Sequence, residues 1–241
     1  MTHRVVQFEW GEQGARVLAA SCDVLVIVDV LSFTTAVEVA VSRGAHVLPF
    51  AGRDPGQAQA FADREQAALA VNRRDITGDK PFSLSPPSLM GLASGTRLVL
   101  PSPNGSTLST VAAECGGTLL AGCLRNAPAV AHAALCLGGT IGVVASGERW
   151  PDGSLRPAIE DLLGAGAIVS AVDVVPRSAE AELAAAAFAY ARDHLARILR
   201  DCRSGQELVD AGFPQDVDVA AQLDVSSTVP IFTRGAYVRM A

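Results

Sequence analysis

Short apolar runs alternate with helix-like segments along most of the chain. The run 24–28 (VLVIV) is continuous and rich in β-branched residues, which is typical of a central strand covered on both faces. Further runs occupy residues 45–50, 98–100, 118–121 and 141–145, and between them apolar residues recur at helical spacing. This alternation predicts an α/β fold, a three-layer α/β/α arrangement with a largely parallel or mixed sheet. We expect residues 1–241 to form a single domain, with two closely packed lobes as the alternative.

A polar turn follows the apolar run 98–100. Its Asn-Gly pair is typical of an ordinary turn or hairpin. The apolar residues beyond it, however, lie three to four positions apart, which favours strand, polar loop and helix. Unpaired N–H groups at the start of such a helix suit an anion such as phosphate, and the turn lacks the Gly-Lys-Ser/Thr of a nucleotide-binding loop. The candidate anion-binding residues are Ser102, Asn104, Gly105, Ser106 and Thr107.

Polar residues also follow the other predicted strands. Asp29 comes directly after the run 24–28, Arg125 and Asn126 follow 118–121, and Glu148 and Arg149 follow 141–145. If these strands and 98–100 are parallel, all four ends lie at one edge of the sheet. A carboxylate there either caps the next helix or binds a cation, and the position of Asp29 leaves both open.

A helix is predicted from Pro157, with Glu160 and Asp161 near its start. Acidic residues at a helix N-terminus interact favourably with the helix dipole, and this is the interpretation preferred for Asp161. Magnesium prefers oxygen ligands and is usually held by one or two carboxylates. The expected Mg²⁺ ligands are Asp29 and Glu160, with Glu148 or Asp161 as alternates.

Two glycines interrupt that same helix. Gly164 and Gly166 each cost about 1 kcal/mol relative to alanine, so we expect another segment to pack very closely against them. Farther on, residues 179–202 read as one long amphipathic helix, Asp216 as the cap of a short helix, and residues 229–231 as an edge strand.

Composition limits the classes of partner. The chain has a formal net charge of -6 and no run of Lys and Arg, which argues against nucleic acid. Charged residues interrupt the N-terminal segment and there is no uncharged apolar stretch of about 18 residues, so we expect no signal peptide, no membrane span and a cytoplasmic location. Five cysteines without C-x-x-C spacing indicate reduced thiols and no zinc site. A mean hydropathy of +0.30 suggests a surface covered in a homo-oligomer.

Several motifs, in order along nearly the whole chain, resemble the 2-phosphosulfolactate phosphatase family of coenzyme M biosynthesis. The resemblance implies a three-layer α/β fold, magnesium, and hydrolysis of a phosphomonoester on a small sulfonated hydroxy acid. One position departs from it, because the family commonly has arginine where this chain has Ser32. The matching motifs are VIVDVLSFTT at 26–35, LPSPNGST at 100–107, GCLRNA at 122–127, ASGER at 145–149, EDLLGAGAI at 160–168, and Ser204-Gly205, Asp216-Val217 and Val229-Pro230 in the tail.

The leading hypothesis is therefore a magnesium-dependent phosphatase of a small acidic phosphomonoester, 2-phospho-3-sulfolactate being the specific candidate. Asp29, Glu148 and Arg149 are the expected catalytic residues, and Arg125 with Asn126 is expected to bind substrate beside the turn 102–107. Attack by a metal-oriented water is the simplest mechanism. The alternative is a non-catalytic domain that binds a phosphorylated metabolite and regulates a partner. A phosphotransferase ranks last because no nucleotide-binding motif is present.

Overall fold

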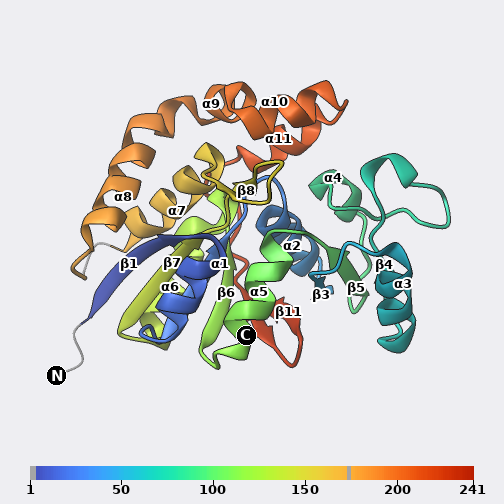
Figure 1. Ribbon diagram of the computed structural model, residues 1–241, viewed down its shortest axis with the longest axis horizontal. Coiled ribbons are helices and arrows are strands. Elements are labelled where there is room, and N and C mark those ends of the chain that lie inside the picture. Colours follow the sequence, from blue (N-terminus) through green and yellow to red (C-terminus); the bar gives the residue numbers. More distant parts are fainter. Residues whose placement is uncertain (1–3, 173–174) are drawn as a thin grey trace.

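The computed structural model describes residues 4–172 and 175–241 and contains a nine-stranded sheet flanked by helices (Figure 1). The expectation of an α/β fold with a largely parallel or mixed sheet is confirmed. In spatial order the strands are β1 (Val5–Trp10), β7 (Thr140–Ala145), β2 (Val24–Val28), β6 (Thr118–Gly122), β10 (Pro230–Thr233), β11 (Ala236–Arg239), β3 (His46–Phe50), β5 (Arg97–Pro101) and β4 (Ala68–Leu69).

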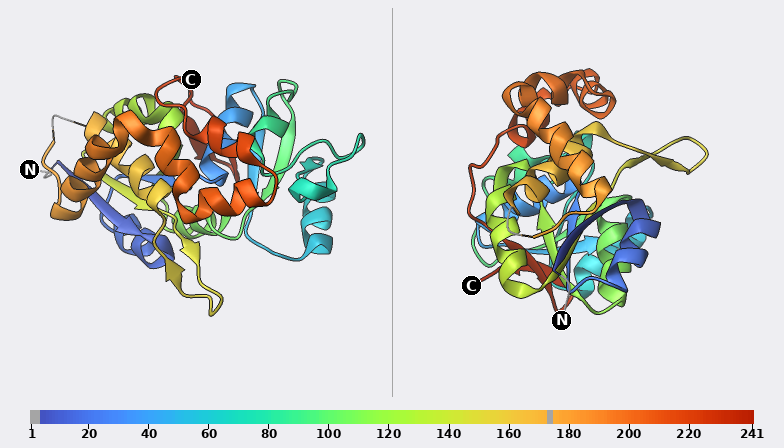
Figure 2. Two further views of the ribbon diagram at one scale, coloured as in Figure 1. Left: turned by 90° about the horizontal axis from the view of Figure 1, so that it is seen from above. Right: turned by 90° about the vertical axis from the view of Figure 1, so that its left-hand side faces the viewer.

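Helices connect most of these strands. A two-stranded hairpin, β8 (Glu148–Arg149) and β9 (Leu155–Arg156), projects away from the body of the molecule (Figure 2). No helix of residues 4–172 or 175–241 is long and apolar enough to cross a membrane. The helices are α1 (Gly11–Ala19), α2 (Phe33–Ser42), α3 (Pro55–Arg64), α4 (Pro86–Leu89), α5 (Gly105–Glu114), α6 (Ala127–Leu137), α7 (Ile159–Ala171), α8 (Ala179–Ala191), α9 (Leu195–Asp201), α10 (Arg203–Asp210) and α11 (Pro214–Ala220), with the 3-10 turns η1 (Arg73–Asp75), η2 (Leu124–Asn126) and η3 (Arg192–His194).

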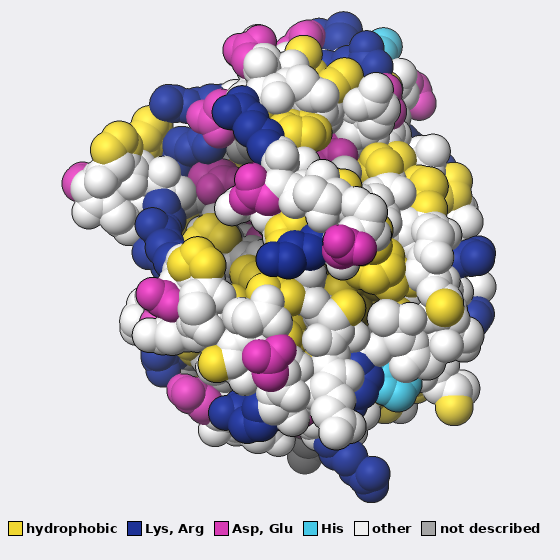
Figure 3. Space-filling view, turned by 90° about the vertical axis from the view of Figure 1, so that its right-hand side faces the viewer, with side chains coloured by type: hydrophobic (Ala, Val, Ile, Leu, Met, Phe, Trp, Pro, Cys, Tyr) yellow, Lys and Arg dark blue, Asp and Glu magenta, His cyan; other side chains and the backbone are white. Residues whose placement is uncertain are grey.

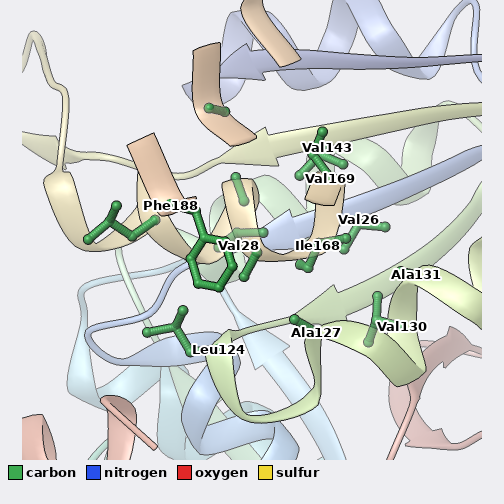
Figure 4. Close-up of a cluster of buried hydrophobic side chains, with 14 of the residues drawn as sticks. Val26, Val28, Leu124, Ala127, Val130, Ala131, Val143, Ile168, Val169 and Phe188 are labelled. Carbon is green, nitrogen blue, oxygen red and sulfur yellow. The ribbon is translucent and has the colours of Figure 1, made fainter. Parts of the chain in front are cut away.

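The central strand β2 explains the three layers. Every residue of β2 is buried, and successive side chains point to opposite faces of the sheet. Val26 and Val28 belong to a core shared with α6, α7 and α8 (Figure 4), while Leu25 and Ile27 belong to a core shared with α1, α2 and α5. An apolar run without polar alternation thus has a covering layer of helices on both sides, as predicted.

The strand directions modify the expected sheet edge. β1, β7, β2 and β6 pair in parallel, so the ends of β2, β6 and β7 do lie at one edge. The β10–β11 hairpin then makes three successive antiparallel pairings, with β6, within itself, and with β3. The expectation that β5 is parallel to β2 is therefore wrong, because this intervening hairpin reverses the pairing direction. The polar turn after β5 reaches Asp29 through α5, which packs on α1 and β2.

The C-terminal part differs from the sequence-based expectation in three places. Residues 230–233 form β10, an interior strand between β6 and β11 rather than an edge strand. The long helix predicted over 179–202 is interrupted by η3, and Leu183 and Tyr190 of α8 are exposed. Asp216 lies inside α11 and binds side chains of other segments instead of capping the helix.

The expectation that the chain forms a homo-oligomer stays a prediction.

The two glycines of α7 lie at close contacts, as expected. A Cβ built on Gly166 would come within 2.1 Å of the backbone oxygen of Ala184 in α8. One built on Gly164 would meet the side chains of Val30 and Val28 at 2.6 and 2.9 Å. Glycine therefore lets α7 press against α8 on one side and against the end of β2 on the other.

We predict that Gly166→Ala lowers the free energy of unfolding by about 1–3 kcal/mol, because the added methyl group meets a backbone atom that cannot move without shifting α8. Urea unfolding followed by circular dichroism measures this change. Gly91→Ala is the matched control, since a Cβ there has nothing within 4 Å, and its change stays within about 0.5 kcal/mol. Equal stabilities of the two variants would contradict the close packing of α7 on α8.

Candidate active site

A cavity of about 1020 Å³ opens beside the ends of β2 and β5. Its inner lining includes Asp29, Ser32, Ser102, Asn104 and Glu148, and it extends outward past α3, η1 and α10. On the face of the molecule shown in Figure 3, basic and acidic side chains are interspersed, with no continuous basic patch. A cavity of this size accommodates a small ligand together with solvent.

Asp29 joins the end of β2 to the start of α5. One carboxylate oxygen accepts a hydrogen bond from the Phe33 backbone N–H at 3.1 Å, and the other accepts one from the Gly105 N–H at 2.9 Å. A Cβ on Gly105 would lie 2.3 Å from the Phe33 ring and 2.7 Å from Asp29 Oδ2, so glycine is required for this approach. The sequence expectation that the carboxylate meets the polar turn is confirmed by this contact.

Burial raises the pKa of Asp29 to about 6, and the charge of Glu160 adds to the shift. The hydrogen bonds from Phe33 and Gly105 and the positive charge of Arg73 act in the opposite direction. Asp29 is thus a buried carboxylate held by backbone amides, with the capacity to accept a proton or a cation near neutral pH.

Glu148 is the second carboxylate of the inner cavity. Its Oε2 accepts a hydrogen bond from the Asn104 side-chain amide at 2.8 Å, which links the base of the β8–β9 hairpin to the turn before α5. Burial raises the pKa of Glu148 to about 7, and the negative charges of Asp29 and Glu160 contribute. A carboxyl with this pKa exchanges protons readily at neutral pH, as acid and base catalysts do.

Glu160 and Asp161 lie behind these residues in the first turn of α7, and neither lines the cavity wall. Both oxygens of Asp161 accept backbone hydrogen bonds, from Val30 at 2.7 Å and from Gly147 at 2.8 Å. Burial, followed by the charges of Asp29 and Glu160, raises the pKa of Asp161 well above its usual value. Asp161 therefore joins the loops after β2 and β7, while the Glu160 carboxylate meets the Cys202 thiol at 3.4 Å.

The hydroxyl groups of the turn 102–107 have different surroundings. Ser102 lines the cavity, as expected for an anion-binding residue. The Ser106 hydroxyl donates to the Leu100 carbonyl at 3.0 Å, and the Thr107 hydroxyl donates to the Pro103 carbonyl at 2.9 Å. The Ser106 and Thr107 side chains therefore fix the turn, whereas Ser102 and Asn104 line the cavity.

The structure does not bring Arg125 and Asn126 to the cavity. Arg125 forms an ion pair with the buried Glu38 at 2.6 Å. The side-chain amide of Asn126 accepts a hydrogen bond from the Cys123 N–H and donates one to the Thr228 carbonyl, both at 2.9 Å. These contacts close the loop after β6, and neither residue lines the cavity. Arg149 lies on the far side of Glu148, where it donates to the Gly153 carbonyl at 3.1 Å and lines a smaller neighbouring cavity.

Arg73 lines the cavity, although no sequence motif indicated it as a site residue. It lies in η1, within the irregular region between α3 and β5, and its Nε donates to Asp216 at 2.7 Å. Its Nη2 donates to the Ser32 hydroxyl at 2.8 Å. Ser32 is the position at which the chain departs from its family resemblance. It was the one feature of the sequence that drew attention to the part of the cavity where Arg73 lies.

A magnesium ion in the cavity would need carboxylate oxygens at the cavity wall. Within the described residues, no group of three or more His, Cys, Asp and Glu side chains is arranged to hold a metal ion. Asp161 and Asp29 each have both oxygens bonded to backbone amides, but Asp29 lines the cavity and Asp161 does not. Asp29 is buried and Glu148 is half-buried, both line the cavity, and a cation there would offset their negative charge. Two carboxylates fit Mg²⁺ where water and substrate oxygens complete the set.

The fold and this cavity define an α/β protein with a small-ligand site at the end of its central strand. Comparison with known proteins then shows the family. Residues 15–235 match the model of the 2-phosphosulpholactate phosphatase family. The chain belongs to this family, whose name denotes phosphoric monoester hydrolases.

Individual relatives agree with the family model. The chain is 30% identical over 212 residues to the 2-phosphosulfolactate phosphatase of Methanothermobacter thermautotrophicus, with 87% of each chain covered. It is 31% identical over 209 residues to a probable 2-phosphosulfolactate phosphatase of Carboxydothermus hydrogenoformans, covering 86% of this chain and 84% of the relative. A relative from Deinococcus radiodurans with the same probable name is 29% identical over 225 residues, and 88% of this chain and 89% of the relative are covered.

We predict that the metal-free protein loses stability as the pH rises through neutrality. The pKa of Glu148 is about 7 in the folded chain against 4.5 in an unfolded one, so folding favours the protonated carboxyl. This contribution is complete below about pH 4.5 and is lost as the pH rises through 7. With chelator present, the free energy of unfolding of Glu148→Gln, measured in urea, should fall between pH 5.5 and 8 by about 1–2 kcal/mol less than that of the parent protein.

Glu114→Gln is the control for this measurement, because Glu114 is an exposed residue at the far end of α5. It should keep the pH dependence of the parent protein. A Glu148→Gln variant that also keeps it would show that the buried carboxyl does not change its protonation on folding.

Proposed function

We propose that the protein is a magnesium-dependent phosphatase that hydrolyses a small acidic phosphomonoester, 2-phospho-3-sulfolactate, to 3-sulfolactate and phosphate. The observation that carries the proposal is the contact of Asp29 with the Gly105 N–H at 2.9 Å, which joins a buried, cavity-lining carboxylate to the start of α5. The printed names of the relatives support the same substrate.

Asp29 is the proposed carboxylate ligand of magnesium, and waters and phosphoryl oxygens would complete the set, because Glu160 lies behind the cavity wall. When bound, the ion supplies positive charge for the phosphoryl oxygens and lowers the pKa of a coordinated water. The amides of Phe33 and Gly105 hold both oxygens of Asp29 in one orientation, so the carboxylate is positioned before substrate enters. Ser102 and Asn104 line the cavity beside it and orient the phosphoryl group.

Glu148 is the proposed proton carrier. The Asn104 amide occupies its Oε2 and fixes the side chain, which leaves Oε1 to accept a proton from the attacking water. The burial that raises its pKa to about 7 makes it a stronger base than an exposed carboxylate. The same carboxyl can return the proton to the leaving alkoxide oxygen, so that water adds across the broken P–O bond.

We expect phosphate release from 2-phospho-3-sulfolactate to require Mg²⁺ and to stop in chelator. Asp29→Asn should lower kcat by about 100-fold or more, because an amide is a poor magnesium ligand and metal assistance is worth several kcal/mol in the transition state. Colorimetric phosphate release measures both effects, and thermal unfolding shows whether the variant is folded. Glu114→Gln, which removes an exposed carboxylate far from the cavity, should keep full activity.

Full activity in chelator would contradict the metal requirement, and full activity of folded Asp29→Asn would remove Asp29 from the site. Thermal stabilisation by the phosphoester without any phosphate release would favour a non-catalytic sensor of a phosphorylated metabolite.

A further inference from the structure

Arg73 is held in the cavity with one edge of its guanidinium available. Asp216, itself buried, accepts from Nε at 2.7 Å, and Ser32 accepts from Nη2 at 2.8 Å. The Phe213 ring lies 5.8 Å from the guanidinium carbon and covers one of its faces. The remaining guanidinium N–H groups have no acceptor among residues 4–172 and 175–241. A guanidinium fixed in this way has lost most of its rotamer freedom before a ligand arrives.

The partners of Arg73 are themselves fixed. The second oxygen of Asp216 accepts from the Ser85 hydroxyl at 2.5 Å, so the carboxylate is oriented from two sides. The Arg73 side chain is only 19% exposed, in contrast to the exposed Arg53 and Lys80 in the outer part of the cavity. Arg73 is therefore the cation of the inner cavity, and its charge reaches far enough to lower the pKa of Asp29.

A simple structural ion pair with Asp216 would not require Arg73 to line the cavity next to Asp29 and Ser32. The volume of about 1020 Å³ leaves room for a ligand that spans from the turn 102–104 to Arg73. A guanidinium that keeps Nη1 for a ligand can donate charge-assisted hydrogen bonds to a carboxylate or sulfonate.

We infer that Arg73, positioned by Asp216 and Ser32, binds the second anionic group of the substrate, a carboxylate or sulfonate, while the phosphoryl group lies beside Asp29 and Asn104. This inference rests on the proposed function for the identity of the reacting group. It assigns the selection of phosphomonoesters that carry a further acidic group, over those that carry none, to a residue outside the loops that follow β2, β5 and β7.

The geometry also gives Ser32 a part in this subsite. Its hydroxyl touches Nη2 of Arg73, so a longer side chain at position 32 extends into the volume that Arg73 fills. Ser32→Arg in an Arg73→Ser background should therefore return a guanidinium to the same corner from the opposite wall.

The first measurement is binding of 3-sulfolactate, which carries the carboxylate and the sulfonate but no phosphate, by isothermal titration calorimetry. Arg73→Gln should weaken binding by about 10- to 100-fold, the effect of losing a charge-assisted pair. Arg74→Gln is the matched control, because it removes the same charge from the next residue of η1, which does not line the cavity, and it should bind as the parent does. The Ser32→Arg, Arg73→Ser variant should recover at least part of the lost affinity.

The Arg73→Gln substitution leaves the buried Asp216 carboxylate without its cation. The double variant Arg73→Gln, Asp216→Asn removes that carboxylate charge as well, so it measures the loss of 3-sulfolactate affinity without an unpaired buried charge.

The kinetic measurement compares 2-phospho-3-sulfolactate with phenyl phosphate. The Arg73 variants should raise KM for the former by about 10- to 100-fold with little change for the latter.

Unchanged binding of 3-sulfolactate by folded Arg73→Gln, absence of binding by the parent, or an equal loss in Arg74→Gln would overturn the inference. Arg73-dependent binding without release of phosphate would leave it standing and contradict the proposed function instead.

Discussion

Four carboxylates share a region of low solvent access at the end of β2, and the surrounding structure depends on how their charges are accommodated. Asp29, Glu160 and Asp161 are almost fully buried, and the charges of Asp29 and Glu160 raise the pKa values of Asp161 and of the fourth carboxylate, Glu148. Backbone amides from distant segments offset the cost of ionising buried carboxylates. Asp161 takes the N–H groups of Val30 and Gly147, and Asp29 takes those of Phe33 and Gly105. The acidic residues thereby hold together the loops that surround the cavity.

Close packing makes these contacts reachable. Gly164 brings α7, and with it Glu160 and Asp161, against the last residues of β2. Gly105 brings the start of α5 against Phe33 and Asp29. At both places a methyl group would enter space that another atom already occupies, so the electrostatic arrangement depends on a steric one. Interiors of this density fix the positions of attached loops to within a fraction of an ångström, as a binding site requires.

Opposite charges are distributed unevenly around the cavity. The carboxylates collect beside the turn 102–104, whereas Arg73 stands on the Ser32 side with Asp216 behind it. An acidic corner is suited to a cation and the reacting phosphoryl group, and a basic corner to a stable anion. The acidic corner would hold a negatively charged group only with a cation bound there, whereas the guanidinium of Arg73 attracts one directly.

The sequence by itself determined the layered α/β architecture, because the all-apolar run 24–28 demands helices on both faces and the helical spacing between strands supplies them. It also singled out Asp29, Asn104 and Glu148, which line the cavity, and Gly105, which contacts Asp29, because all four follow predicted strands closely along the chain. Only the tertiary structure decided which arginine lines the cavity. Arg125 forms an ion pair with the buried Glu38, whereas Arg73, from an irregular segment, lines the cavity. Local spacing carries no information on such long-range pairings, which depend on how the β10–β11 hairpin reverses the sheet and on the contacts of Arg73 with Asp216 and Ser32.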